Sequence, residues 1–218
     1  QDSSLLPPGE VDVILGSPPY NVGMPYSGWD DLLPEDIYLR CLKNWLTSCF
    51  VWADPHHGRL LLVVPIDTHK KGPFPLAAHA TRIAIEVGWR YRATVLWAEP
   101  STKSWIVPSK RATDPDYHCS AESILIFYRG SWARPAPDTI DITPAEYADW
   151  CRGVWTVKAH SRSTSAYPAA FPDELVERLM RQFTFRGDRV LDPWAGGGTT
   201  LRVGKRLGRN CTGIDISA

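Results

Sequence analysis

The fold of this chain is decided by the stretch DPWAGGGTT, residues 192–200. It follows a short apolar run, Arg189 to Asp192, and leads into a helical pattern from Thr199 to Leu207. Glycines between a strand and a helix let the backbone approach a ligand closely, and a helix N-terminus favours anionic groups. The stretch lacks the third glycine of the dinucleotide fingerprint and the lysine of a phosphate loop. Asp215 ends the next predicted strand, where an acid can accept hydrogen bonds from ribose hydroxyls. The stretch alone leaves two interpretations open, a nucleoside site and a tight turn.

Working outward, short apolar runs alternate with helical patterns along the whole chain. The predicted strands are Val11–Leu15, Arg59–Val64, Trp89–Trp97, Ser123–Tyr128, Arg189–Asp192 and Asn210–Ile214. The predicted helices are Pro34–Phe50, Phe74–Val87, Pro172–Thr184 and Thr199–Leu207. Thr143-Pro144-Ala145-Glu146 also has the spacing of a helix capping box, with proline at the first helical position. This alternation predicts an α/β fold with a mostly parallel sheet. In such sheets ligands bind beyond the carboxyl ends of the strands, so residues at those ends are candidate site residues.

A second such strand end carries Ser17-Pro18-Pro19-Tyr20. The two prolines fix the backbone and remove two N–H donors. Carbonyl oxygens, a hydroxyl and an aromatic face remain, and together they suit an amino group on a flat ring. The alternative interpretation is a turn that simply ends the strand.

The composition limits the classes of function. The chain has 218 residues, with 24 Lys and Arg against 24 Asp and Glu, and its net charge is zero. A protein that coats nucleic acid by bulk charge is therefore excluded, and DNA binding would need a local basic patch. The loop Ser101–Arg111 offers such a patch. Its candidate DNA-binding residues are Lys103, Trp105, Lys110 and Arg111.

The length predicts a single domain over residues 1–218, with recognition-type insertions at about 100–120 and 129–153. The five cysteines are odd in number and form no Cys-x-x-Cys pair, which argues against a disulfide framework and a zinc ribbon. We therefore expect no metal, reduced thiols and a cytoplasmic protein. The longest apolar run, Leu60–Ile66, is too short to cross a bilayer, so no membrane association is expected.

Taken together, the two motifs resemble those of the DNA amino-methyltransferases, which methylate an exocyclic nitrogen of adenine or cytosine with S-adenosylmethionine. Ser17–Tyr20 is similar to that family's (Asp/Asn/Ser)-Pro-Pro-(Tyr/Phe) catalytic motif. Residues 192–200 are similar to its Asp-Pro-Phe-x-Gly-x-Gly-Thr-Thr cofactor loop, with Trp194 in place of phenylalanine. The catalytic motif precedes the cofactor loop, as in the permuted β class. The resemblance implies a Rossmann-like methyltransferase sheet with helices on both faces and a circularly permuted motif order.

The same resemblance implies roles for individual residues. Pro168–Leu175 resembles a His-Pro-Ala-x-Phe-Pro segment of the family, although Tyr167 replaces the histidine, and Asp2 resembles the aspartate of a Gly-Asp pair. The implied catalytic residues are Ser17, Pro18, Pro19 and Tyr20. The implied cofactor-binding residues are Asp2, Phe171, Asp192, Pro193, Trp194, Gly196, Gly198, Thr199, Thr200 and Asp215.

The implied reaction is direct attack of the amino nitrogen of a flipped-out base on an activated methyl group. None of the five cysteines follows a proline, which argues against methylation at the C5 carbon of cytosine. A serine at the first motif position is associated in the family with cytosine N4, so Ser17 favours N4-methylcytosine. Three alternatives stay open: an adenine N6 enzyme, a methyltransferase acting on RNA or a small molecule, and a non-catalytic DNA-binding or partner subunit. The expected partner is double-stranded DNA; a homodimer, a restriction endonuclease and a second subunit are the candidate protein partners.

Overall fold

The computed structural model describes residues 3–69, 72–98, 121–135, 137, 140–158 and 170–216. The strands are β1 (Val13–Gly16), β2 (Arg59–Pro65), β3 (Arg90–Ala98), β4 (Ala121–Tyr128), β5 (Val154–Thr156), β6 (Arg189–Asp192) and β7 (Asn210–Gly213). The helices are η1 (Ser3–Leu5), α1 (Glu35–Trp52), α2 (Leu76–Val87), α3 (Pro144–Trp150), α4 (Asp173–Phe183) and α5 (Thr199–Arg206). Every predicted strand and helix is present, with ends that differ from the prediction by at most two residues.

The described strands form one sheet in the order β5-β3-β4-β2-β1-β6-β7. The pairings of β1 with β2 and β6, of β6 with β7 and of β3 with β5 are parallel, which confirms the mostly parallel sheet. β4 runs antiparallel between β2 and β3. Neither the direction of β4 nor the existence of β5 was predicted, because a strand pattern carries no direction and β5 has only three residues.

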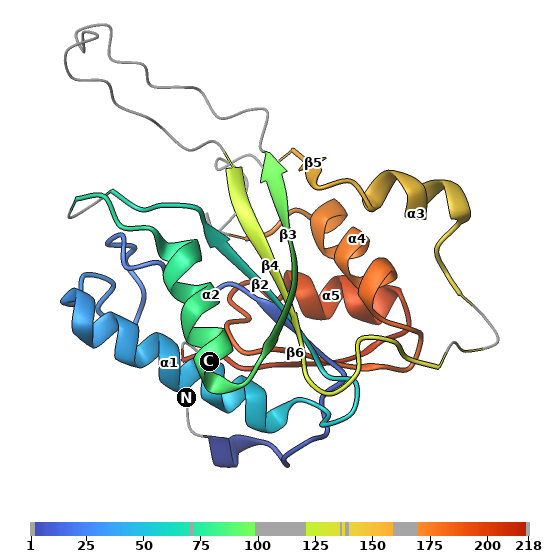
Figure 1. Ribbon diagram of the computed structural model, residues 1–218, viewed down its shortest axis with the longest axis horizontal. Coiled ribbons are helices and arrows are strands. Elements are labelled where there is room, and N and C mark those ends of the chain that lie inside the picture. Colours follow the sequence, from blue (N-terminus) through green and yellow to red (C-terminus); the bar gives the residue numbers. More distant parts are fainter. Residues whose placement is uncertain are drawn as a thin grey trace, which may run out of the picture.

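Helices cover both faces of the sheet, as expected (Figure 1). Side chains of successive strand residues point to opposite faces. Ile14 of β1 therefore packs with α1 and α2, whereas Val13 and Leu15 pack with α4 and α5. Successive residues of β2 likewise face opposite sides of the sheet. Helices cover both sides, which explains why β1 and β2 are each a continuous apolar run in the sequence. The α/β fold class is confirmed.

Local signals also placed the helix ends. Pro34 precedes α1, and the acids Glu35 and Asp36 stand in its first turn, where their negative charge interacts favourably with the helix dipole. At α3 the predicted capping box is formed: the Thr143 hydroxyl accepts from the Glu146 N–H at 3.2 Å, and the Glu146 carboxylate accepts from the Thr143 N–H at 2.9 Å. Among the described helices, none has the length and apolar character to cross a bilayer. The single-domain boundaries stay a prediction.

The topology brings the ends of separate strands to one edge of the sheet. β1 ends at Gly16 and its parallel neighbour β6 ends at Asp192, so the segments that follow them start side by side. Because β4 is antiparallel, its first residues lie at this same edge, and Glu122 stands opposite Pro65 at the end of β2. This edge therefore collects residues from the start, middle and end of the chain.

Candidate active site

A cavity of about 760 Å³ opens at the carboxyl edge of β1 and β6, and both predicted motifs line it. This volume lies within the range of small-molecule sites. The predicted site residues that line it are Ser17, Pro19, Phe171, Asp192, Pro193, Trp194, Gly196, Thr199, Thr200 and Asp215. Pro18, Tyr20 and Gly198 stand next to lining residues but do not themselves form the wall. Asp2 and the four candidate DNA-binding residues, Lys103, Trp105, Lys110 and Arg111, lie outside the described residues.

The glycine turn after β6 is held by short-range hydrogen bonds. Asp192, which is only 3% exposed, accepts from the Trp194 N–H at 3.0 Å. Burial raises the pKa of Asp192 to about 6, while hydrogen bonds from Thr200 and the Trp194 N–H act in the opposite direction. Gly198 adopts a left-handed conformation with φ 73° at the N-cap of α5, and this conformation favours glycine. These interactions fix the shape of a turn whose residues 192–197 line the cavity.

Asp215 lies against this turn rather than apart from it. One of its carboxylate oxygens accepts from the Gly196 N–H at 2.8 Å. The connection is reinforced by backbone hydrogen bonds from Ala195 N–H to Ile214 and from Ile214 N–H to Asp192, at 3.0 and 2.9 Å. The two acids predicted at the ends of β6 and β7 therefore belong to one connected loop pair.

An aromatic wall closes the inner side of the cavity. Trp45 of α1 contacts Trp29 with ring centroids 5.1 Å apart, and Trp194 with centroids 6.1 Å apart. The indole N–H groups of Trp29 and Trp194 are buried and have no hydrogen-bond partner among the described residues. Because Trp29, Trp45 and Trp194 all line the cavity, this wall suits a flat, largely apolar group of a ligand.

The Ser-Pro-Pro-Tyr motif and the loop that follows it are held by side chains 7 to 19 residues further along the chain. The buried Tyr38 of α1 donates its hydroxyl proton to the Pro19 carbonyl at 2.8 Å. The buried Asp31 carboxylate accepts from the backbone N–H groups of Asn21, Val22 and Met24 at 2.9 to 3.0 Å. Sequence reasoning missed both anchors. No pattern marks Tyr38 or Asp31, since each contact depends on how the loop folds back.

Tyr20 points its hydroxyl into the sheet. The hydroxyl donates to the Glu122 Oε2 atom at 2.9 Å and makes a longer contact with the Val63 carbonyl at 3.4 Å. Burial and the Glu122 charge raise the pKa of Tyr20 well above its usual value, while a hydrogen bond from the Ser17 hydroxyl lowers it. Burial likewise raises the pKa of Glu122, against the effect of the Tyr20 hydrogen bond. Glu122 was not among the predicted site residues.

Gly16 joins the two motifs. A Cβ atom at this position would lie 2.6 Å from Asp192 Oδ1 and 3.1 Å from Trp194 Cε3, both shorter than ordinary contacts. Only a glycine therefore lets the end of β1 and the turn after β6 approach this closely. Its place directly before Ser17 was the available sequence signal, and it went unused.

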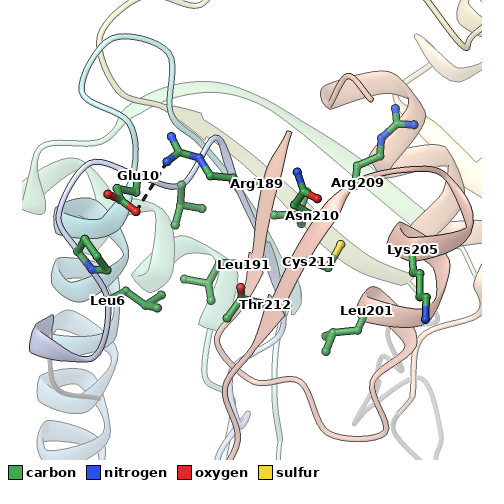
Figure 2. A pocket seen from close by; sticks show the side chains of 13 residues that line it. Leu6, Glu10, Arg189, Leu191, Leu201, Lys205, Arg209, Asn210, Cys211 and Thr212 are labelled. Atoms are coloured by element: carbon green, nitrogen blue, oxygen red, sulfur yellow. Dashed lines mark ion pairs between the residues drawn. The ribbon is translucent and has the colours of Figure 1, made fainter. Parts of the chain in front are cut away.

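A second cavity, of about 530 Å³, lies at β6 and β7 and is lined by none of the predicted site residues. Figure 2 shows Arg189 directed toward Glu10, with which it forms an ion pair at 3.8 Å. Arg209, also on the wall, is committed to Asp141 through both of its terminal nitrogens. Arg189 and Arg209 of this second cavity are engaged in ion pairs, and none of the predicted site residues lines it, so we place the candidate site in the larger cavity. Within the described residues, no cluster of three or more His, Cys, Asp or Glu side chains could hold a metal ion.

Comparison with known proteins agrees with this placement. A model of the DNA methylase family, N6_N4_Mtase, matches residues 11–218. The type II methyltransferase M.MjaVI of Methanocaldococcus jannaschii is 35% identical over 159 residues, which is 72% of this chain and 81% of that protein. The DNA adenine methyltransferase YhdJ of Escherichia coli K12 is 23% identical over 226 residues, covering 98% of this chain and 74% of that one.

Two solved structures share the fold. TTHA0409 of Thermus thermophilus, assigned as a DNA modification methylase, matches with a TM-score of 0.77 and 25% identity over 98% of this chain and 84% of that one. The cytosine-N4-specific PvuII DNA methyltransferase matches with a TM-score of 0.75 and 17% identity, over 99% of this chain and 78% of that one. The sheet described above is therefore a Rossmann-like methyltransferase sheet.

Proposed function

Because this chain belongs to the DNA methylase family, as a β-class DNA amino-methyltransferase that uses S-adenosylmethionine, we propose that it methylates the N4 amino group of cytosine. The observation that carries the proposal is that the catalytic motif and the cofactor segments line one shared cavity, at the edge of β1 and β6. Ser17 and Pro19 of the catalytic motif line it together with Asp192, Trp194 and Asp215 of the cofactor segments. A donor and an acceptor of a methyl group could meet only if both sets of residues faced one space.

The residues of the turn suit S-adenosylmethionine, which supplies an activated methyl group on its sulfonium. Asp215 is the acceptor for ribose hydroxyls, because it lies two residues beyond β7 and beside the turn. Trp29, Trp194 and Phe171 line the cavity and offer apolar contact to the ring system of the ligand. Pro193, Gly196, Gly198, Thr199 and Thr200 shape the backbone around the ligand. Asp192, nearly fully buried, acts chiefly by holding the turn.

On the opposite side of the cavity, the Ser17 hydroxyl and the Pro18 carbonyl are the acceptors for the two hydrogens of the substrate's amino group. Accepting both hydrogens favours a pyramidal nitrogen, whose lone pair is then free to attack the methyl group. This is catalysis by positioning and electrostatics, and it needs no covalent enzyme intermediate. The proton leaves after transfer, to solvent. Tyr20 is proposed to stack on the flipped base once DNA is bound.

Cytosine N4 is favoured over adenine N6 by Ser17, and the cytosine-N4-specific PvuII enzyme shares the fold. Adenine N6 is the second candidate, because YhdJ, a DNA adenine methyltransferase, is similar over 98% of this chain. The intact motifs argue against a non-catalytic DNA-binding or partner subunit. An RNA or small-molecule substrate would share the cavity chemistry but not the family assignment.

The remaining proposals concern the binding partners of the protein and its location in the cell. Double-stranded DNA is the substrate, and Lys103, Trp105, Lys110 and Arg111 are the proposed contacts to it. A homodimer, a restriction endonuclease or a second subunit is proposed as the protein partner. The four cysteines of the described residues are free thiols, in keeping with the proposed cytoplasmic location.

The test is nucleoside mass spectrometry of mixed-sequence duplex DNA after incubation with the protein and methyl-labelled S-adenosylmethionine. Labelled N4-methylcytosine is the expected product. Labelled N6-methyladenine would overturn the assignment of cytosine while leaving the chemistry of the cavity in place. A Ser17→Ala variant is the control for contaminating activity and should yield no label above background.

A further inference from the structure

A loop of residues 21–33, here called the strap, spans the cavity from the catalytic motif to the cofactor side. It starts directly after Tyr20 and ends just before α1. Its middle part reaches the segment after β7, because a Cβ atom added at Gly28 would lie 3.9 Å from the Ile216 Cδ1 atom. Five residues of the strap line the cavity: Met24, Pro25, Tyr26, Ser27 and Trp29.

The first four N–H groups of the strap are all accepted by one residue, Asp31. Its Oδ1 atom accepts from Asn21 at 2.9 Å, and its Oδ2 atom accepts from Val22 and Met24, both at 3.0 Å. Its backbone carbonyl accepts from the Gly23 N–H at 2.9 Å. Successive N–H groups that converge in this way form a concave site for a negative charge. Asp31, only 3% exposed, fills that site and so ties the two ends of the strap together.

A second contact closes the base of the strap. The Asn21 backbone is left-handed, with φ 61°, a conformation that asparagine adopts more readily than most residues. Its side-chain Nδ2 atom donates to the Leu33 carbonyl at 2.9 Å, and its Oδ1 atom accepts from the Leu33 N–H at 2.7 Å. Asn21 and Asp31 therefore fix both ends of the strap, and the residues between them are held over the cavity.

The middle of the strap is also joined to the cofactor side through aromatic rings. Trp29 of the strap contacts Trp45 of α1, with ring centroids 5.1 Å apart. Trp45 in turn contacts Trp194 of the turn after β6, with centroids 6.1 Å apart. The strap thus continues the wall that the turn after β6 begins.

From these contacts we propose that Asp31 is a positioning residue for the cofactor: it keeps residues 24–29 across the cavity, where they hold bound S-adenosylmethionine. Asp31 is not part of the cavity wall, so it acts through the strap. A loop that is already ordered loses little conformational entropy when a ligand binds, which favours affinity. The inference rests on the proposed function in one respect, the placement of the cofactor in this cavity, and does not depend on which base is methylated.

The first test measures affinity for S-adenosylmethionine by calorimetry. An asparagine has one oxygen where aspartate has two, so Asp31→Asn must lose the hydrogen bonds at either Oδ1 or Oδ2. We expect affinity to fall about tenfold, the size of one hydrogen bond to a charged group. The matched control is Asp30→Asn, because the exposed Asp30 accepts from the Leu32 N–H through one oxygen, a bond that asparagine can keep. Wild-type affinity in Asp31→Asn would overturn the proposal.

A second variant covers the case in which Asp31→Asn does not fold. Asn21→Gly removes both hydrogen bonds to Leu33, and glycine adopts the positive φ of this position without strain. It leaves Asp31 unchanged but releases the base of the strap. Affinity for S-adenosylmethionine should again fall, and wild-type affinity in this variant would also speak against the strap.

The second test follows the strap directly, by hydrogen–deuterium exchange of peptides from residues 21–33. In the wild type, S-adenosylmethionine should slow exchange in these peptides, because the cofactor holds the strap closed. Without cofactor, exchange should be faster in Asp31→Asn than in the wild type or in Asp30→Asn. Exchange in the strap that does not respond to the cofactor would show that the two are not in contact, and the proposal would be wrong.

The third test separates positioning of the cofactor from a general structural role. On DNA that the wild type methylates, Asp31→Asn should raise KM for S-adenosylmethionine about tenfold. Its kcat at saturating cofactor should stay within about twofold of the wild type, since the catalytic motif is unchanged. A fall in kcat at unchanged KM would mean that Asp31 supports the catalytic motif instead, which contradicts the proposal.

The outcomes also distinguish this inference from the proposed function. If Asp215→Ala lowers the affinity for S-adenosylmethionine and Asp31→Asn does not, the role of Asp31 is wrong and the proposed function stands. If neither variant lowers it, the placement of the cofactor in this cavity is wrong, and both proposals fall. Labelled adenine in place of cytosine overturns only the choice of base, because calorimetry and exchange are measured without DNA.

Discussion

The two sides of the cavity are built by different means. The turn after β6 is held mainly by bonds between near neighbours, such as Asp192 to Trp194, and by its immediate partner strand through Asp215. The motif after β1 is held by Tyr38 of α1, which donates to the Pro19 carbonyl from 19 residues away, and by Glu122 of β4, which accepts from the Tyr20 hydroxyl across 102 residues. The comparison teaches that the proposed cofactor side is held by contacts within about 20 residues of chain, whereas the proposed catalytic side also draws on β4 through Glu122, 102 residues away.

Substitution at the junction of the two sides should have the largest effect. Gly16→Ala would place a Cβ atom 2.6 Å from the Asp192 carboxylate, so either β1 or the turn must move. We expect a loss of about 3 kcal/mol in the free energy of unfolding, measured by urea denaturation, together with weaker cofactor binding and slower methyl transfer. The matched control is Gly153→Ala, where an added Cβ meets nothing within 4 Å. If Gly16→Ala kept the full stability of the wild type, the claim that β1 and the turn after β6 depend on their close approach at Gly16 would be wrong.

The second prediction concerns the pH dependence of the locally built side. Burial raises the pKa of Asp192 from its ordinary 3.8 to about 6, so the folded state holds this proton more tightly than the unfolded state. Its contribution to stability is therefore greatest at low pH and is lost as the pH rises through about 4 to 6. Asp192→Asn cannot ionise and should lack this loss. The difference in the free energy of unfolding between wild type and variant should change by about 2 to 3 kcal/mol across this window.

Denaturation of both proteins at a series of pH values, without cofactor, checks this prediction. The wild type should lose stability relative to Asp192→Asn as the pH rises. A difference that stays constant with pH would mean that Asp192 is better solvated than its burial indicates.

The third prediction concerns the affinity of the protein for S-adenosylmethionine. Asp215→Ala removes the proposed ribose acceptor and the partner of the Gly196 N–H. Calorimetric affinity for S-adenosylmethionine should fall about tenfold or more, the cost of one hydrogen bond to a charged group. Asp36→Ala, an exposed acid on α1, is the control and should bind normally. An unaltered affinity in Asp215→Ala would remove Asp215 from the cofactor site.

The smallest effect is expected from the motif after β1. Tyr38→Phe removes the hydrogen bond to the Pro19 carbonyl without changing the packing of a fully buried ring. We expect methyl transfer to slow several-fold and stability to fall by about 1 kcal/mol, with cofactor affinity almost unchanged. The exposed Tyr147 supplies the control Tyr147→Phe. A loss of cofactor affinity equal to the loss of rate would contradict the division into two sides.

Much of the fold could be predicted because its signals are local. The apolar runs predicted the ends of the strands to within two residues. The spacing of Thr143 and Glu146 predicted a capping box at the start of α3, and the structure contains it. β5 could not be predicted, because Val154–Thr156 is too short to show a period and pairs with β3 only after the sheet has formed. The antiparallel direction of β4 was also beyond reach, since alternation of side chains is the same in both directions.

The sequence by itself determined the two motifs, the strands that end at them and the expectation of a shared sheet edge. These follow from periodicity, from glycine and proline geometry and from hydrogen bonds between near neighbours, which short stretches of chain specify. Only the tertiary structure decided that Gly16 lies against Asp192, that the Tyr38 hydroxyl donates to the Pro19 carbonyl and that the Tyr20 hydroxyl donates to Glu122. Those contacts depend on the order and direction of strands, and these are set by packing of the whole sheet rather than by any local pattern.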